Sequence, residues 1–358
     1  MEIFNLQIFT NIDCNLNCTY CYEHIRDVKN LNVNNIKEYI NLSFKKYSIE
    51  YKTFKIHFKG GEPFLHSYLI NDIIKYSISK SKEYGINVFF HCNTNATLIY
   101  KSKYIQDILL EYKDILFLGI SIDGNKQYND LNRKYLNGKG SYEDIIKSIE
   151  WLRENYNINN LELRITPVHN NINNLFSSLK ELIDLNITDI VFNLVYEEKW
   201  TLNDGIILLK HLIESIEYII DNNKNNKFYF VNYGNKYNAK IKGNYCGICN
   251  NTICLGKDNL IYPCNKFYIL FNKDLAIYDN EINIINQNLI NEIYSMYNNY
   301  TDDCKQCDIN NECALCIASI YKTNIQKFFN DKNICGWSYA IKMFFNYCKQ
   351  KNYNLMTY

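Results

Sequence analysis

The chain has 358 residues, of which 47% are apolar, enough for one large domain or for two with a packed core. Its formal net charge is +1, so bulk electrostatics gives no indication of binding to nucleic acid or to an anionic membrane. No apolar run approaches the roughly 18 residues of a membrane span, and the first residues lack the basic start and cleavage site of a signal peptide. We therefore expect a soluble, cytoplasmic protein.

Residues 1–200 alternate between short β-rich runs and longer runs with helical periodicity. Strands are predicted at residues 3–10, 53–59, 87–92, 116–122, 161–167 and 189–196. Helices are predicted at residues 34–48, 68–84, 101–112, 142–155, 174–185 and 202–220. Six strand–helix units predict an α/β fold, a partial (β/α)6 TIM-like barrel, with its chemistry at the C-terminal ends of the strands.

The character of the chain changes after a polar stretch, residues 221–226, which is a predicted linker. Ten of the fourteen cysteines lie beyond it, between Cys246 and Cys348. In a long cytosolic chain, so many cysteines favour metal ligation or redox chemistry over disulfides. We therefore predict two domains, residues 1–225 and residues 226–358, the second small, cysteine-rich and held together by metal.

Three cysteines near the N-terminus, Cys14, Cys18 and Cys21, have the spacing C-x3-C-x2-C. Three thiolates from one loop can hold three irons of a [4Fe–4S] cluster and leave the fourth iron open for a substrate. Two alternatives stay open: packing of the three side chains on one helical face, and a zinc site with a fourth ligand nearby. The intervening Asn and Thr residues are poor helix formers, which favours a loop.

Two further motifs accompany this triplet, a GGEP motif that begins at Gly60 and an SIDG motif that begins at Ser121. The combination resembles the radical S-adenosylmethionine (radical SAM) superfamily. Gly60 and Gly61 allow a close backbone approach after a strand. The resemblance implies that Glu62 offers its carboxylate to the ammonium of a bound methionine moiety. Alone, the GGE motif would more often be a turn.

The resemblance extends over about residues 3–200. Residues 91–98 are similar to the family's TNGTLL strand end, with Asn-Ala in place of Asn-Gly. Residues 129–142 resemble the HDxxRxxxxGxGSY segment of sulfatase-maturating and peptide-modifying members, with Asn129 where His is usual.

This resemblance implies further residues that bind SAM. Arg133 would clamp the methionine carboxylate, which a guanidinium can do bidentately. Ser121 would form a hydrogen bond with the same ligand, Tyr22 would approach the adenine, and Asn93 would contribute from the end of the third strand. For Arg133 alone, the alternative is a solvated surface arginine.

The resemblance also implies the reaction. SAM chelates the open iron, and an electron from an external donor of the flavodoxin or ferredoxin type, passed through the cluster, cleaves the sulfonium to yield a 5′-deoxyadenosyl radical. That radical abstracts hydrogen from unactivated carbon. Cys14, Cys18 and Cys21 are thereby expected to serve catalysis as well as metal binding.

The later cysteines resemble the SPASM extension of this family, which binds two auxiliary [4Fe–4S] clusters. The extension implies one cluster held by Cys304, Cys307, Cys313 and Cys335. It implies a second cluster held by Cys264 and Cys316 with two of Cys246, Cys249 and Cys254, of which we favour Cys246 and Cys249 because Cys254 falls at a strand position.

Three features of this match are notable. Asn259 stands where the family has Gly, and Asn tolerates the left-handed conformation. The spacing between Cys313 and Cys316 is one residue shorter than the family's. Two structural zinc sites remain the alternative, because C-x2-C pairs are the usual zinc-ribbon arrangement. Cys92 and Cys348 are expected to be buried or spare thiols.

SPASM enzymes mostly modify peptides or proteins, so we predict oxidative modification of a ribosomally made precursor peptide, by a thioether or other side-chain crosslink. The alternative is anaerobic sulfatase maturation, the conversion of Cys or Ser to formylglycine. Sulfatase-maturating members carry an Asp as a base directly after the cysteine that corresponds to Cys264. Here that residue is Asn265, whose carboxamide cannot accept a proton at neutral pH.

Other classes are less compatible with the sequence. The triplet lies so near the start that no leader-binding domain is expected before it, which leaves a separate leader-binding partner as an option. A molybdopterin-type cyclase would end in a glycine-bearing tail, which residues 352–358 lack. A non-catalytic zinc or nucleic-acid module would leave the GGEP and SIDG motifs without a purpose.

Overall fold

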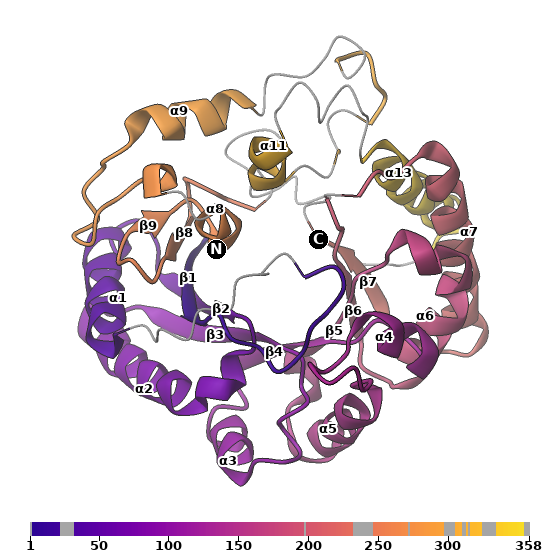
Figure 1. Cartoon of the computed structure of the whole chain (residues 1–358), viewed down its shortest axis with the longest axis horizontal. Helices are drawn as coiled ribbons and strands as arrows, with labels where there is room; N and C mark the ends of the chain where they lie inside the picture. The colour runs from indigo at the N-terminus through magenta and orange to yellow at the C-terminus, as the bar shows by residue number, and fades with distance from the viewer. Residues whose placement is uncertain are drawn as a thin grey trace. The chain divides into compact units, whose positions relative to one another are not determined.

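The computed structural model describes residues 2–21, 32–196, 198–231, 246–270, 273–296, 305–309, 313, 316–323 and 334–353 (Figure 1). The chain divides into two compact units, each assembled from separate stretches of sequence. Unit 1 comprises Met1–Ser121, Arg133–Leu161 and Cys246–Asn291. Unit 2 comprises Ile122–Asn132, Glu162–Tyr245 and Glu292–Tyr358.

Unit 1 contains a sheet with the strand order β4-β3-β2-β1-β8-β9, parallel throughout except for the last pair. Its strands are β1 (Ile3–Asn11), β2 (Thr53–Gly60), β3 (Asn87–Thr94), β4 (Leu116–Ser121), β8 (Thr252–Leu255) and β9 (Ile261–Tyr262). Its helices are α1 (Val33–Tyr47), η1 (Pro63–His66), α2 (Ser67–Tyr84), α3 (Lys103–Glu111), α5 (Tyr142–Asn155), η2 (Ile158–Asn160), α8 (Asn265–Ile269) and η4 (Lys273–Leu275).

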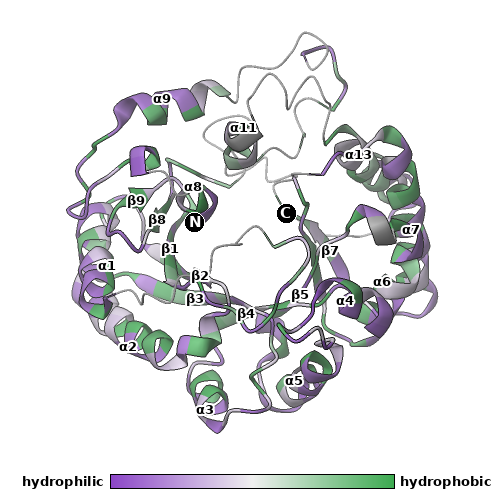
Figure 2. Cartoon of the chain, in the orientation of Figure 1, coloured by the Kyte–Doolittle hydropathy of each residue, from purple (hydrophilic) through white to green (hydrophobic). Residues whose placement is uncertain are grey.

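Hydrophobic alternation decides which face of this sheet packs on the helices. Phe4 of β1 stacks on Tyr47 of α1 with ring centroids 4.2 Å apart, and Phe54 of β2 contacts Phe44 of α1 at 4.9 Å. Successive strand residues point to opposite faces, so every second residue of β1 and β2 faces this helix layer. Helices α2 and α3 carry both hydrophobic and hydrophilic residues, as amphipathic helices do (Figure 2).

Local signals explain where several helices begin and end. The Asn32 side chain accepts a hydrogen bond from the Asn34 N–H at the start of α1, and α2 ends at Gly85, whose φ is +61°. Helix α7 of unit 2 begins with a reciprocal capping box between Thr201 and Asp204. These boundaries lie within three residues of those predicted from the sequence.

Unit 2 contains three parallel strands in the order β7-β6-β5. They are β5 (Leu161–Ile165), which begins at the last residue of unit 1, β6 (Asp189–Phe192) and β7 (Lys227–Phe230). The helices are α4 (Lys126–Asn132), η3 (His169–Asn174), α6 (Leu175–Asp184), α7 (Leu202–Asp221), α11 (Ile317–Thr323) and α13 (Cys335–Gln350). Helix α9 (Gln287–Met296) crosses the boundary between the units.

The predicted α/β class and the alternation of strands and helices are confirmed. The sequence analysis placed a strand position at Cys254, which lies in β8, but it did not delimit β7, β8 or β9, which have four, four and two residues. Strands this short contain too few residues for a periodic pattern. None of the helices in the described ranges is long and apolar enough to cross a membrane.

Two helices of unit 2 that are far apart in sequence, α7 and α13, approach each other at glycines. A Cβ added at Gly205 would overlap the carbonyl group of Gly336, and a Cβ added at Gly336 would overlap the Thr201 carbonyl. The Gly336 N–H donates to the Trp200 carbonyl oxygen at 2.9 Å, and the Trp200 and Trp337 rings lie 5.2 Å apart. This close approach requires the absence of a side chain at both glycines.

We expect Gly336→Ala to lower the free energy of unfolding by about 1–3 kcal/mol, because the added methyl group meets backbone that cannot move aside cheaply. Urea titration with a fluorescence readout measures the change. The control is Lys349→Ala in the same helix, at an exposed position. Equal stability of the two variants would contradict the close packing of α7 on α13.

Candidate active site

The cysteine triplet lies in a loop that follows β1. This loop, residues 12–21, contains no helix, so the alternative of three thiols packed on one helical face is wrong. Leu16 is 2% exposed and forms an antiparallel bridge with Tyr135, and the Asn17 N–H donates to the Lys134 carbonyl oxygen at 2.6 Å. The loop is thus attached to a second segment more than a hundred residues away.

The GGEP motif runs directly against the start of this loop. The Gly61 N–H donates to the Asn11 carbonyl oxygen at 3.3 Å, and the Glu62 N–H donates to that of Asp13 at 2.9 Å. Gly60 has a φ of +142°, and a Cβ there would overlap the Asn11 carbonyl; a Cβ at Gly61 would overlap the Asp13 carbonyl. Both glycines are therefore required for the contact between these two backbone segments.

Glu62 is 1% exposed and joins the ends of two strands. Its carboxylate accepts hydrogen bonds from the Phe64 N–H at 3.1 Å, the Thr94 hydroxyl at 2.7 Å and the Asn95 N–H at 2.6 Å. Burial raises its pKa to about 7, although the three hydrogen bonds oppose that shift. Of the roughly four lone-pair directions of a carboxylate, these donors leave about one for a ligand.

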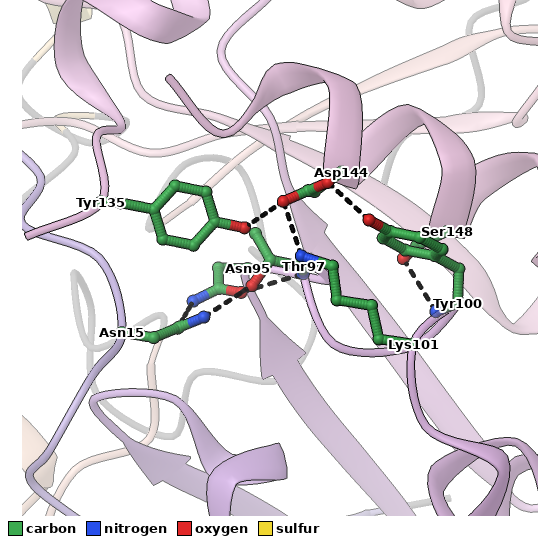
Figure 3. A network of polar contacts seen from close by, with 8 residues as sticks. All are labelled: Asn15, Asn95, Thr97, Tyr100, Lys101, Tyr135, Asp144 and Ser148. Carbon is green, nitrogen blue, oxygen red and sulfur yellow. Dashed lines mark hydrogen bonds and ion pairs between the residues drawn. The ribbon is translucent and has the colours of Figure 1, made fainter. Parts of the chain in front are cut away.

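A polar network links the cysteine loop to two other segments (Figure 3). Asn95 donates to the Asn15 carboxamide oxygen at 2.8 Å, and Asn15 donates to the Thr97 hydroxyl at 2.8 Å.

In a second part of the network, the Asp144 carboxylate accepts hydrogen bonds from Tyr100 at 2.6 Å and Tyr135 at 2.5 Å. These bonds and the nearby Lys101 lower the pKa of Asp144 to about 2, despite partial burial. The carboxylate is therefore ionised at neutral pH.

Arg133 lies beside the cysteine loop. It is 7% exposed, its Nη1 is 4.0 Å from the Cys18 sulfur, and its guanidinium carbon is 5.4 Å from the centre of the Tyr20 ring. The Ser141 hydroxyl donates to the Arg133 carbonyl oxygen at 2.8 Å. The alternative of a solvated surface arginine is therefore wrong.

The three thiols of the loop interact with one another and with Glu62. Burial, together with the negative charges of Glu62, Cys18 and Cys21, raises the pKa of Cys14 to about 12, although a hydrogen bond from the Leu16 N–H opposes that shift. A thiol in such surroundings ionises when a cation joins the site, because the cation offsets both causes. The three thiols are thus chemically suited to ligate a metal together.

The other predicted SAM-binding residues lie at the ends of neighbouring strands. Asn93 is the penultimate residue of β3, and its buried Oδ1 atom has no hydrogen-bond partner among the described residues. Ser121 is the last residue of β4 and is half-buried. Tyr22 lies outside the described residues. A buried carbonyl oxygen without a partner is unusual, and a bound ligand could satisfy it.

A second group of cysteines gathers in unit 1. Burial and the nearby thiols of Cys264 and Cys246 raise the pKa of Cys249, whose φ is +58°. Cys254 lies in β8, fully buried. Asn259 has a φ of +63°, which confirms that it takes the left-handed conformation expected where the family has Gly.

The cysteines from Cys304 onward belong to unit 2. Cys313 lies 3.4 Å from the Ser338 hydroxyl, Cys335 begins α13, Cys316 is buried, and Cys307 is exposed; Cys304 lies outside the described residues. Within the described ranges, no group of three or more His, Cys, Asp or Glu side chains is arranged to hold a metal ion. Cys92 and Cys348 are buried, as expected.

The SIDG turn in unit 2 explains one departure from the family pattern. The Asn129 carboxamide oxygen accepts a hydrogen bond from the Asp123 N–H at 3.2 Å, and the Asp123 carboxylate accepts one from the Thr166 N–H at 3.1 Å. Asn129 and Asp123 are both fully buried. Asn129, at the position where His is usual, therefore supports this turn through its side-chain oxygen.

Sequence reasoning did not identify several residues that shape the site. Asn11 donates to the carbonyl oxygens of Asp13 and Glu62 at 2.8 and 2.9 Å, and Thr94 binds Glu62. Thr94 and Asn95 lie within the segment that resembles the TNGTLL motif, so that match contained a signal for them. A lone Asn11 in an Asn-rich chain offered none.

Comparisons with known proteins define the class. A family model described as the radical SAM superfamily matches residues 9–189, which is half of the chain. An uncharacterized protein of Methanocaldococcus jannaschii is 33% identical over 52% of this chain and 60% of its own length. A cysteine-type anaerobic sulfatase-maturating enzyme of Clostridium novyi is 25% identical over 97% of this chain and 94% of that enzyme.

Two solved structures are similar in fold. Native anSMEcpe with bound AdoMet has a TM-score of 0.73 at 18% identity, covering 97% of this chain and 100% of that one. Streptococcus suis SuiB bound to the precursor peptide SuiA has a TM-score of 0.64 at 16% identity, covering 89% of this chain and 73% of that one. These similarities confirm the predicted α/β fold class of a partial parallel barrel.

The chain belongs to the radical SAM superfamily and is an enzyme. Membership implies a [4Fe–4S] cluster and SAM as cofactors. The donor chemistry fits both groups: three interacting thiols lie in one loop with a guanidinium beside them, and a buried oxygen of Asn93 has no hydrogen-bond partner among the described residues.

We expect Gly61→Ala to lower SAM cleavage about 100-fold, because the added Cβ displaces Asp13 and with it the cysteine loop. The assay is 5′-deoxyadenosine formation by anaerobically reconstituted protein with dithionite and SAM. The control is Gly85→Ala, at a φ of +61° but with no atom within 4 Å of the added Cβ. Activity of Gly61→Ala equal to that of the control would contradict the required approach.

Proposed function

We propose that this radical SAM enzyme oxidatively modifies a ribosomally made precursor peptide, by forming a thioether or another side-chain crosslink. The cofactors, when bound, supply a 5′-deoxyadenosyl radical that abstracts hydrogen from unactivated carbon. The substrate class is supported by the similarity in fold to SuiB, which was solved bound to the precursor peptide SuiA. A flavodoxin- or ferredoxin-type protein would donate the electron, and a separate protein could bind the leader of the peptide.

The observation that separates this reaction from formylglycine formation is Asn265. It is the first residue of α8, directly after Cys264, and its N–H donates to the Gln7 side-chain oxygen at 2.8 Å. Its carboxamide cannot accept a proton from a Cys or Ser substrate. A maturase of the sulfatase type would therefore need a different base.

Sulfatase maturation is the second candidate. It is favoured by the similarity to the Clostridium novyi enzyme, which extends over 97% of this chain. Both candidates use the same radical and differ in the peptide that enters and in the fate of the oxidised carbon.

The site residues are assigned roles as part of this proposal. Cys14, Cys18 and Cys21 would ligate the cluster. The backbone at Gly60 and Gly61, together with Glu62, would hold the methionine ammonium, and Arg133 its carboxylate. The remaining SAM contacts are proposed for Asn93, Ser121 and Tyr22.

We further propose two auxiliary [4Fe–4S] clusters, and a functional division at residues 225 and 226 between the SAM-binding part and the auxiliary-cluster part. One cluster would take Cys246, Cys249, Cys264 and Cys316. The other would take Cys304, Cys307, Cys313 and Cys335. The electrostatic coupling of Cys249 to Cys246 and Cys264 supports the first set.

The auxiliary clusters predict a metal content. Anaerobically reconstituted protein should contain about twelve iron atoms per chain, four for each cluster. Cys249→Ala should lose about four of them, whereas Cys254→Ala, with its thiol buried in β8, should keep them all. Elemental analysis for iron and zinc measures this. About four irons with stoichiometric zinc would contradict the auxiliary clusters.

The proposed function predicts a choice between two peptides, offered to the reconstituted enzyme with SAM and a reductant. A precursor peptide from a neighbouring gene should lose one hydrogen atom from each of two residues. A sulfatase peptide with Cys or Ser should show no aldehyde that a hydrazide reagent captures. Tandem mass spectrometry distinguishes the products, and Cys18→Ala is the inactive control. Aldehyde formation alone would assign the enzyme to sulfatase maturation.

A further inference from the structure

A row of polar side chains crosses the middle of the sheet in unit 1. Gln7 of β1 is paired in register with His57 of β2, which is paired with His91 of β3. Residues paired in register on parallel strands point to the same face of a sheet. We call Gln7, His57 and His91 the polar row.

The polar row lies on the face of the sheet opposite α1. Phe4 and Phe54 contact α1, and side chains alternate along a strand, so Gln7 and His57 point away from that helix. The α8 helix lies on this second face, where Phe9 contacts Tyr268 with ring centroids 4.8 Å apart. The polar row is therefore separate from the apolar core under α1.

The two imidazoles of the row are in direct contact. His91 Nδ1 is 3.1 Å from His57 Nε2, with ring centroids 4.5 Å apart. His57 is 8% exposed and His91 is half-buried. In the neutral pair one ring donates its N–H to the other, so one proton lies between the two rings. The pair can take up one additional proton.

The surroundings of the pair oppose a second positive charge. Lys55 and Lys59 lie two residues before and after His57 on the same strand face, and Phe89 and Asn93 flank His91 in the same way. Gln7 and Phe117 are the register neighbours on either side. Once the pair has taken up one additional proton, a second would place two imidazolium ions side by side. The two protonation steps therefore occur at different pH values.

The polar row lies between Asn265 and Asn93, two residues of the candidate site. Gln7 accepts the hydrogen bond from the N–H of Asn265, the residue that cannot act as a base. Since neighbouring strands are about 4.8 Å apart, His57 and His91 lie one and two strand spacings from Gln7. Asn93, with its buried oxygen that has no partner among the described residues, follows His91 by two residues, about 7 Å along β3.

We propose that the His57–His91 pair is the proton acceptor for oxidation of the peptide, in the role that Asn265 cannot fill. This inference rests on the proposed function. It applies to a thioether or ether crosslink and to formylglycine formation, because in each of these a thiol or hydroxyl loses its proton during oxidation.

The substrate C–H bond breaks and its hydrogen atom forms the new C–H bond of 5′-deoxyadenosine. The neighbouring thiol or hydroxyl gives its proton to the imidazole pair. The sulfur or oxygen forms a new bond to the carbon, either a crosslink or a second bond to its own carbon. The remaining electron passes to an oxidised auxiliary iron–sulfur cluster, which is the oxidant in this step.

The test compares His57→Gln and His91→Gln with His211→Gln, a control that replaces an equally buried histidine bonded to Glu214. The substrate is whichever of the two peptides above the wild-type enzyme oxidises. We expect oxidised product to fall about 100-fold in the first two variants while 5′-deoxyadenosine formation stays within about twofold. Wild type should lose product on acidification, and this dependence on pH should disappear in both variants.

A second measurement does not depend on turnover. Histidine C2 hydrogen–deuterium exchange, followed by mass spectrometry across pH in the reconstituted full chain, reports the protonation of each ring. We expect two separate steps for His57 and His91, and a single shifted step for His57 in His91→Gln.

The outcomes are distinct. Wild-type protein that makes no 5′-deoxyadenosine with either peptide overturns the proposed function and this inference with it. Wild-type activity with unchanged product and pH profile in both Gln variants overturns the inference alone. A parallel fall of product, 5′-deoxyadenosine and iron content would show a structural role and also overturn it. Independent titration of the two rings contradicts the pairing.

Discussion

The close contact between two backbone segments, Gly60–Gly61 and residues 11–13, is the constraint on which the candidate site depends. Two hydrogen bonds join the segments, and both glycines leave space that a Cβ would fill. A loop of ten residues with three thiols has little hydrophobic surface of its own. The contact holds its beginning against β2, so the thiols emerge at the carboxyl end of the sheet, where parallel α/β folds place their chemistry.

The rest of the loop is held by polar side chains whose own partners are buried. Asn15 is attached to Asn95 and Thr97, and Leu16 and Asn17 pair with the segment that carries Arg133. Burial of such groups is costly unless each finds a partner. The network therefore favours one arrangement of the loop, with a guanidinium beside the thiols.

Three departures from the family's motifs are accommodated by backbone and hydrogen-bond geometry. Ala96 and Asn259 occupy Gly positions with φ values of +58° and +63°. Asn129, in place of His, accepts the Asp123 N–H. None of these changes removes a group that would touch SAM in the proposed assignment. Asn265 differs, because it replaces a titratable side chain, and that loss is what the histidine pair on the same sheet would offset.

Much of this protein could be determined from the sequence alone, because local patterns decide local structure. Periodicity indicated strands and helices of the first 200 residues within a few positions. The resemblance of the motifs to the radical SAM family implied that the cysteines, Glu62 and Arg133 share one site. Only the tertiary structure decided the rest. The two-residue strand β9 has no period to detect, and the contacts of Gln7 with Asn265 and of His57 with His91 join residues whose proximity depends on strand order and register. Those follow from packing of the whole sheet, which no short stretch of sequence encodes.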